Sequence, residues 1–186
     1  MSDATDNWGH WERTLSEPGD DLRIFKARFD TFLHPVTKAP LRATILETHP
    51  WVEIVAFTAD RRIVMVRQFR FGIADVTLEC PAGLVDDGEL HRDAAIRELR
   101  EETGYTTADW TYLGHVHQNP ASHTGDVHFW LARDAERTFE PSPDEGEHIA
   151  VVTLSREEVV AAVHAGEIRN PYTLVALSRV LDLRVV

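Results

Sequence analysis

The chain is poor in cysteine, in positive charge and in long apolar runs, and each shortage excludes a class of protein. A single cysteine, Cys80, excludes an internal disulfide and favours a reducing compartment. A formal net charge of −12 disfavours a nucleic-acid surface, which needs a basic stripe, and an anionic membrane. No apolar run reaches the length of a membrane span, and the N-terminus lacks signal-peptide features. We therefore expect a cytoplasmic protein that binds neither nucleic acid nor membrane.

Length and composition indicate one domain. The 186 residues suffice for one hydrophobic core, and no linker, repeat or low-complexity segment divides them. Runs of β-branched and apolar residues between turn signals predict strands. The first two strands are expected to form an antiparallel pair joined by a turn over residues 17–21. The expected strands span 11–15, 22–33, 41–48, 52–58, 63–69, 77–80, 110–118, 127–133 and 149–154.

Three helices are expected from their terminal signals. The first begins at Glu89 or Leu90 and ends before Gly104. A capping-box pattern over residues 155–158 begins the second, and Asn170 followed by proline begins the third. The last two helices are expected to include residues 159–164 and 172–183. Strands that alternate irregularly with helices predict an α/β or α+β fold, a mixed sheet with helices on both faces.

The first of these helices gathers acidic side chains. Glu98, Glu101 and Glu102 are three and four residues apart and fall on neighbouring strips of the helix. Like charges at this spacing destabilise a bare helix by roughly 0.2–0.5 kcal/mol per pair, so something should compensate. Hard divalent cations do so, since Mg²⁺ is held by carboxylates together with substrate phosphates. The alternative is a solvated acidic face that Arg97 and Arg100 neutralise by local pairing.

A longer pattern surrounds these carboxylates. Residues 83–105 read GLVDDGELHRDAAIRELREETGY. The spacing G-x5-E-x7-R-E-L-x-E-E-x-G resembles the signature of the Nudix hydrolases, which cleave nucleoside diphosphates linked to another moiety. Residues 66–71 and 78–83, with Pro120 following Gly104 at 16 residues, look like the branch that cleaves ADP-ribose and nucleoside diphosphate sugars. Tyr105, in place of the usual aliphatic residue, is a mild departure.

This resemblance implies a fold and an assembly. It implies an α/β/α sandwich with a mixed sheet and an N-terminal extension of antiparallel strands. Residues 1–186 would form a single Nudix domain. Within it, residues 1–48 would serve dimerisation and substrate binding, and residues 49–186 would form the catalytic core. We therefore expect a homodimer.

The resemblance also implies the roles of individual residues. The implied metal ligands, for Mg²⁺ with Mn²⁺ as a possible substitute, are the carbonyl of Ala82 and the carboxylates of Glu98, Glu101 and Glu102. The implied catalytic residues are Glu98, Glu102, Arg97 and Glu145. Arg97 would orient the carboxylates, and Glu145 would accept the proton of the attacking water, with Glu147 as its rival. The candidate substrate-binding residues are Arg70, Arg42, Phe25 and Glu79. The alternatives are an edge-strand charge for Arg70, and Ile24 in place of Phe25 or an ordinary core role for both.

Two questions stay open in the sequence. The loop 119–126 departs from the Ser-Pro-Gly pattern of the resembling branch, so ADP-ribose and a nucleoside diphosphate sugar are equally plausible substrates. The alternatives to this hydrolase are a module of the same fold that binds a nucleotide without cleaving it, and a Nudix enzyme for nucleoside triphosphates or dinucleoside polyphosphates. A module that only binds a nucleotide has no need for a complete set of carboxylates, so their presence argues against it.

Overall fold

The computed structural model describes residues 9–143, 146 and 148–184. They gather into two compact units, and each is described by itself. The first comprises the residues up to His49 together with His117–Gly125, and the second comprises Pro50–Val116 and the residues from Asp126 onward. The single Nudix domain with regions 1–48 and 49–186 stays a prediction.

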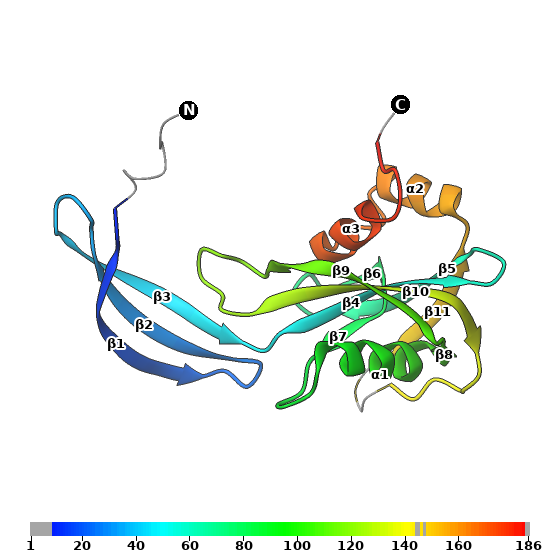
Figure 1. Cartoon of the computed structure of the whole chain (residues 1–186), viewed down its shortest axis with the longest axis horizontal. Coiled ribbons are helices and arrows are strands. Elements are labelled where there is room, and N and C mark those ends of the chain that lie inside the picture. The colour runs from blue at the N-terminus through cyan, green and yellow to red at the C-terminus, as the bar shows by residue number, and fades with distance from the viewer. Residues whose placement is uncertain (1–8, 144–145, 147, 185–186) are drawn as a thin grey trace. The chain divides into compact units, whose positions relative to one another are not determined.

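The first unit contains a three-stranded antiparallel sheet (Figure 1). Its strands, in spatial order, are β1 (Glu12–Asp21), β2 (Phe25–Leu33) and β3 (Pro40–Thr48). The turn expected over residues 17–21 is wrong, because β1 continues to Asp21 and the chain reverses over residues 22–24. Pro18 is tolerated because β1 is an edge strand, where a missing N–H breaks no ladder, and the pairing shifts between Pro18 and Asp21.

The second unit is built on a mixed eight-stranded sheet whose central path runs β11-β5-β4-β10-β8. β10 runs parallel to β4, and the other pairings recorded for this sheet are antiparallel. β6 pairs with β5, β7 with β4, and β9 with β10. The bounds are β4 (Trp51–Thr58), β5 (Ile63–Arg70), β6 (Asp75–Glu79), β7 (Ala82–Leu84), β8 (Tyr105–Thr106), β9 (Asp109–His117), β10 (Asp126–Arg137) and β11 (Ile149–Leu154).

Three helices flank this sheet: α1 (His91–Thr103), α2 (Arg156–His164) and α3 (Pro171–Ser178). Their termini carry the expected signals. Gly104 ends α1 with φ of 76°, and Ser155 and Glu158 form the capping box of α2. Asn170 caps α3 through the N–H of Tyr172. The prediction that the last helix reaches residue 183 is wrong. It ends at Ser178, where the N–H groups of Arg179 and Val180 bond three residues back, as in a tightened last turn.

Alternation along β4 separates two hydrophobic clusters. Ile54 packs in the cluster that includes Leu99 of α1, whereas Val55 packs in the cluster that includes Val159 of α2 and Leu177 of α3. Accordingly, α1 covers one face of the sheet, and α2 and α3 cover the other (Figure 1). The predicted α/β/α sandwich with a mixed sheet is confirmed. Within the described residues, no helix is both long and apolar enough to span a membrane.

Candidate functional site

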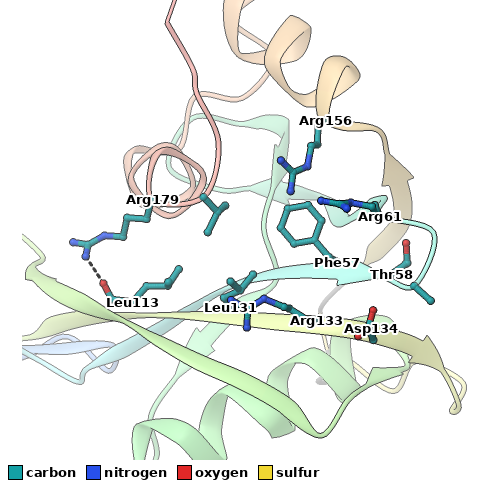
Figure 2. Close-up of a pocket in the computed structure, with 11 residues that line it drawn as sticks. Phe57, Thr58, Arg61, Leu113, Leu131, Arg133, Asp134, Arg156 and Arg179 are labelled. Carbon is teal, nitrogen blue, oxygen red and sulfur yellow. Dashed lines mark hydrogen bonds between the residues drawn. The ribbon is translucent and has the colours of Figure 1, made fainter.

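Two cavities of the second unit differ in the chemistry of their walls. A cavity of about 620 Å³ is lined mainly by arginines and apolar side chains, and none of the predicted site residues that the structure describes borders it (Figure 2). A smaller cavity of about 330 Å³ lies beside α1. We place the candidate active site at this smaller cavity on its chemistry rather than its size. The predicted site residues that line it are Arg70, Ala82, Arg97, Glu98, Glu101 and Glu102.

The first two residues of β7, Ala82 and Gly83, pack against the acidic face of α1. The N–H of Ala82 donates a hydrogen bond of 3.0 Å to Oε2 of Glu102, whose carboxylate is buried. A Cβ atom at Gly83 would overlap the carboxylate of Glu98. Glycine is therefore needed here because another group approaches the backbone closely. This contact holds Glu98 and Glu102 at one wall of the cavity.

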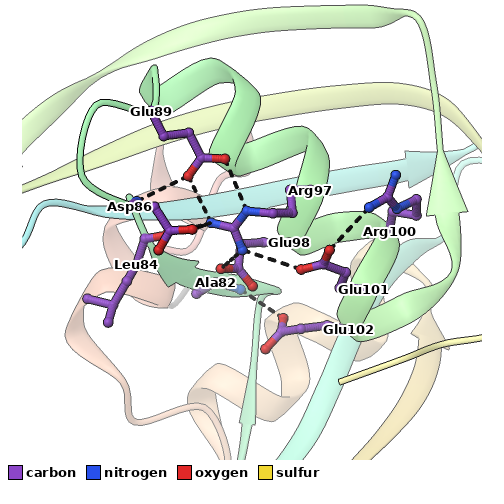
Figure 3. Close-up of polar contacts among 9 residues, drawn as sticks. All are labelled: Ala82, Leu84, Asp86, Glu89, Arg97, Glu98, Arg100, Glu101 and Glu102. Atoms are coloured by element: carbon purple, nitrogen blue, oxygen red, sulfur yellow. Dashed lines mark hydrogen bonds and ion pairs between the residues drawn. The ribbon is translucent and has the colours of Figure 1, made fainter. Parts of the chain in front are cut away.

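Arg97 links the carboxylates around the turn (Figure 3). It forks onto Glu89 through Nε–Oε1 and Nη2–Oε2 contacts of 3.0 and 2.9 Å. Its Nη1 lies 2.7 Å from Oε1 of Glu98 and 3.3 Å from Oε2 of Glu101, and its Nη2 donates to the carbonyl of Leu84. The hydrogen bond from Arg97 lowers the pKa of Glu89, and the pairing raises the pKa of Arg97. These are the contacts that an orienting role requires; the role itself stays a prediction.

The donor set fits a hard divalent cation in its chemistry. Glu98, Glu101 and Glu102 supply carboxylate oxygens and the turn supplies backbone carbonyls, which are the ligands that Mg²⁺ takes. Among the described residues, however, no three His, Cys, Asp or Glu side chains converge as a metal cage. Arg97 engages Glu98 and Glu101, while the Ala82 N–H engages Glu102. The donors are thus gathered at one cavity and directed toward protein partners.

Arg70 and Glu79, both expected to contact substrate, contact each other. Arg70 forks onto Glu79 with Nε–Oε1 and Nη2–Oε2 distances of 3.2 and 2.6 Å. Thr77 and Asn170 donate to the same carboxylate. Burial alone would raise the pKa of Glu79, but these donors, Arg70 foremost, hold that pKa below its usual value. Glu79 is buried and borders a different cavity, so Arg70 is the member of the pair that reaches the candidate site.

Glu53 is an acidic residue that the sequence interpretation missed. It is fully buried in β4 and lies opposite Ala82 in the ladder with β7. Burial raises the pKa of Glu53 to about 8, against the hydrogen bond of 2.5 Å that it accepts from Oγ1 of Thr173. The signal in the sequence is one carboxylate within an apolar strand. The residue that donates to it lies 120 positions away, which no local pattern indicates.

Two further predicted residues belong to the first unit, and two fall outside the described part of the chain. Phe25 and Arg42 belong to the first unit, where Arg42 lies 4.0 Å from the ring centroid of Phe29 and 3.6 Å from Glu17. Glu145 and Glu147 lie outside the residues that the structure describes. The assignments of these four residues therefore stay predictions.

Comparisons with known proteins agree on one family. Residues 47–175 match the family described as NUDIX domain. An ADP-ribose pyrophosphatase of Bacillus subtilis is 33% identical over 131 residues, which cover 69% of this chain and 71% of that protein. A methanol dehydrogenase activator of Bacillus methanolicus is 28% identical, with coverage of 83% and 84%. The crystal structure of an ADP compounds hydrolase superposes with a TM-score of 0.81 over 91% of each chain at 22% identity, which shows the shared fold.

Proposed function

Because the chain belongs to the NUDIX domain family, we propose that it hydrolyses the pyrophosphate bond of ADP-ribose or of a nucleoside diphosphate sugar. The products would be a nucleoside monophosphate and a sugar phosphate. One observation carries this proposal. The turn at Gly83 seats the carboxylate of Glu98 beside Glu102, at a cavity that Arg70 also lines. Carboxylates for a cation and a guanidinium for phosphate are the groups that a diphosphate substrate needs.

Nudix hydrolases in general need a divalent metal, and we propose Mg²⁺, with Mn²⁺ as a substitute. The carbonyl of Ala82 and the carboxylates of Glu98, Glu101 and Glu102 would hold it. When bound, such an ion polarises phosphoryl oxygens and lowers the pKa of bound water. The protein supplies the positioning: Arg97 keeps Glu98 and Glu101 in one orientation, and Ala82 keeps Glu102 against the turn.

The remaining roles are proposed on the resemblance. Glu145 would accept the proton of the attacking water, with Glu147 as the alternative. Each is exchanged for glutamine, and the variant with the larger loss of kcat identifies the residue that accepts the proton. Arg70 would pair with a phosphate, braced by Glu79 from behind. Arg42 and Phe25 would contact substrate from the N-terminal strands. The single cysteine supports a cytoplasmic location.

A substrate panel with product masses tests this proposal. The full-length protein is incubated with Mg²⁺ and ADP-ribose, ADP-glucose, GDP-mannose, ATP or a dinucleoside tetraphosphate. We expect monophosphate and sugar-phosphate masses from the first three and little from the others. Glu102→Gln should lower turnover by about 100-fold or more, since loss of one preorganised electrostatic group costs that much, with an unchanged melting temperature. Binding without cleavage in the wild type would identify a nucleotide-binding module, and faster cleavage of ATP would overturn the substrate class.

A further inference from the structure

We propose that the 620 Å³ cavity is a second anion site, which binds a small phosphorylated molecule away from the acidic helix. We call it the arginine cleft. It lies in the second unit beside the last residues of β4, where α2, α3 and β10 face one another (Figure 2). Its volume lies within the range of about 300–1,000 Å³ that is common for small-molecule sites. The residues that define it are Phe57, Arg61, Arg133, Arg156 and Arg179.

The charge of the arginine cleft opposes that of the chain. The protein carries a net charge of −12, yet the described residues that line this cavity include four arginines and one carboxylate, Asp134. The arginines come from four separate places: the turn after β4, β10, the first residue of α2, and the C-cap of α3. A cleft lined by one sign of charge concentrates its field on a ligand of the other sign. Guanidinium groups match phosphate because their planar fork donates two hydrogen bonds at once.

Two of these arginines are free to pair with a ligand, and the other two are held by contacts within the protein. Among the residues that the structure describes, neither Arg61 nor Arg156 forms an ion pair; the guanidinium carbon of Arg156 lies 4.9 Å from the ring centroid of Phe57. Both side chains point over that ring (Figure 2). By contrast, Arg133 donates to Thr111 at 2.8 Å and lies 3.4 Å from Asp109, and Arg179 donates to the carbonyl of Leu113.

The backbone gives an independent reason to regard Arg61 as functional. It holds a left-handed conformation with φ of 63°, in a turn closed by hydrogen bonds between Thr58 and Arg62. Glycine and asparagine favour such a turn position, whereas an arginine with a Cβ is disfavoured there. Asp134, which also lines the cleft, holds φ of 51°. Disfavoured conformations of this kind cluster at ligand-binding sites, where function retains the side chain.

The arginine cleft is separate from the candidate active site, since the two cavities share no lining residue among those that the structure describes. β4 reaches both: Trp51 lines the cavity beside α1, and Phe57 and Thr58 line the arginine cleft. The six steps along the strand from Trp51 to Phe57 span about 20 Å. Two ligands can therefore bind at the same time, and each site can be tested without altering the other.

Calorimetry on the full chain in EDTA tests the proposal, with AMP, ribose 5-phosphate and inorganic phosphate as probes and adenosine as the phosphate-free control. The variants are Arg61→Gly and Arg156→Ala, with the exposed Arg92→Ala of α1 as a matched control outside the cleft. We expect Arg61→Gly and Arg156→Ala each to weaken AMP binding by about tenfold, the loss typical of one charge-assisted hydrogen bond. Arg92→Ala should bind AMP like the wild type.

Arg61→Gly distinguishes a loss of binding from a folding defect, because glycine favours the left-handed conformation of this turn. Its melting temperature should equal or exceed that of the wild type while its AMP binding falls. Equal binding of phosphate and AMP would mean that the cleft recognises the phosphate group alone, and tighter AMP binding would identify a nucleoside monophosphate; both support the proposal. It is overturned if no phosphorylated probe binds, if adenosine binds as tightly as AMP, or if binding persists in both cleft variants.

Discussion

Gly83 shows how a residue without a side chain sets the position of a carboxylate. Because a Cβ there would overlap the carboxylate of Glu98, Gly83→Ala should push that carboxylate away from the turn. The group that a Cβ would meet is the end of a partly exposed side chain rather than backbone, so the fold should tolerate the change. We expect turnover to fall by about 10–100-fold, as for other residues that orient metal ligands, with little change in melting temperature. Gly72→Ala is the matched control, since a Cβ there meets open space.

One result from the two glycine variants would contradict this prediction. If Gly83→Ala and Gly72→Ala turn over substrate at the same rate as the wild type, the position of Glu98 against the turn does not matter for the reaction.

Glu53 makes stability depend on pH in a direction unusual for a carboxylate. Its pKa is raised from 4.5 to about 8 in the folded chain. Below pH 4.5 the folded and unfolded chains both hold the proton; between pH 4.5 and about 8, only the folded chain does. The contribution of this group to the free energy of unfolding is therefore full at low pH and is lost as the pH rises toward 8, by at most about 1.4 kcal/mol per pH unit.

Glu53→Gln removes this dependence, because glutamine cannot ionise and still accepts the hydrogen bond from Thr173. The free energy of unfolding of the variant minus that of the wild type should rise by roughly 1 kcal/mol per pH unit across this window. Urea unfolding of both proteins from pH 5 to pH 8 measures it. A difference that stays flat would mean that Glu53 is ionised in the fold.

At the scale of single residues, the sequence indicated the acidic cluster and Arg97 because their spacing on one helix is local information. Arg70 of β5 pairs with Glu79 of β6. That Glu79 is buried behind Arg70 follows from how the strands pack, which a local sequence pattern does not contain. The sequence did not indicate Glu53, because its environment also depends on packing. Its high pKa arises from burial, in a site completed by Thr173 of α3.

At the scale of elements, Arg97 offsets the repulsion between the negatively charged side chains on α1. Its fork contacts Glu89 twice, and the same guanidinium contacts Glu98 and Glu101. Arg97→Lys keeps the charge but loses the planar fork, so the carboxylates should lose their common orientation. We expect turnover to fall by about 10–100-fold. Thermal unfolding should show a loss on the order of 1 kcal/mol.

Arg100→Lys is the control for this change. Arg100 is half exposed and pairs only with Glu101 among the ion pairs of the described residues, so its loss should cost little. Equal effects of the two substitutions on steady-state turnover would contradict the orienting role of Arg97.

The elements that sequence predicted best are those with chemical signals at their ends. Gly104, the capping box at Ser155 and the Asn170–Pro171 pair each mark a helix end that the structure contains. The first hairpin was mispredicted because Pro18 and Gly19 are turn residues in most contexts. An edge strand with irregular pairing accommodates them, and that depends on the sheet rather than on local sequence.

At the scale of the molecule, the first unit bears on the proposed homodimer. Several large apolar side chains of its strands and turns are exposed, and pairing of two copies would remove such side chains from water. They are Leu15, Leu22, Ile24, Val36 and Leu41. Light scattering during size exclusion should give twice the chain mass of 21.1 kDa at micromolar concentration. A mass of 21.1 kDa at every concentration would rule out the dimer.

The whole chain carries excess negative charge, so a diphosphate can approach α1 only if cations offset Glu98, Glu101 and Glu102. Anomalous diffraction from crystals grown with Mn²⁺ and a non-hydrolysable ADP-ribose analogue tests this most directly. We predict a manganese peak within carboxylate bonding distance of Glu98 and Glu102, with the diphosphate beside it. An analogue bound in that cavity without manganese beside α1 would contradict the account.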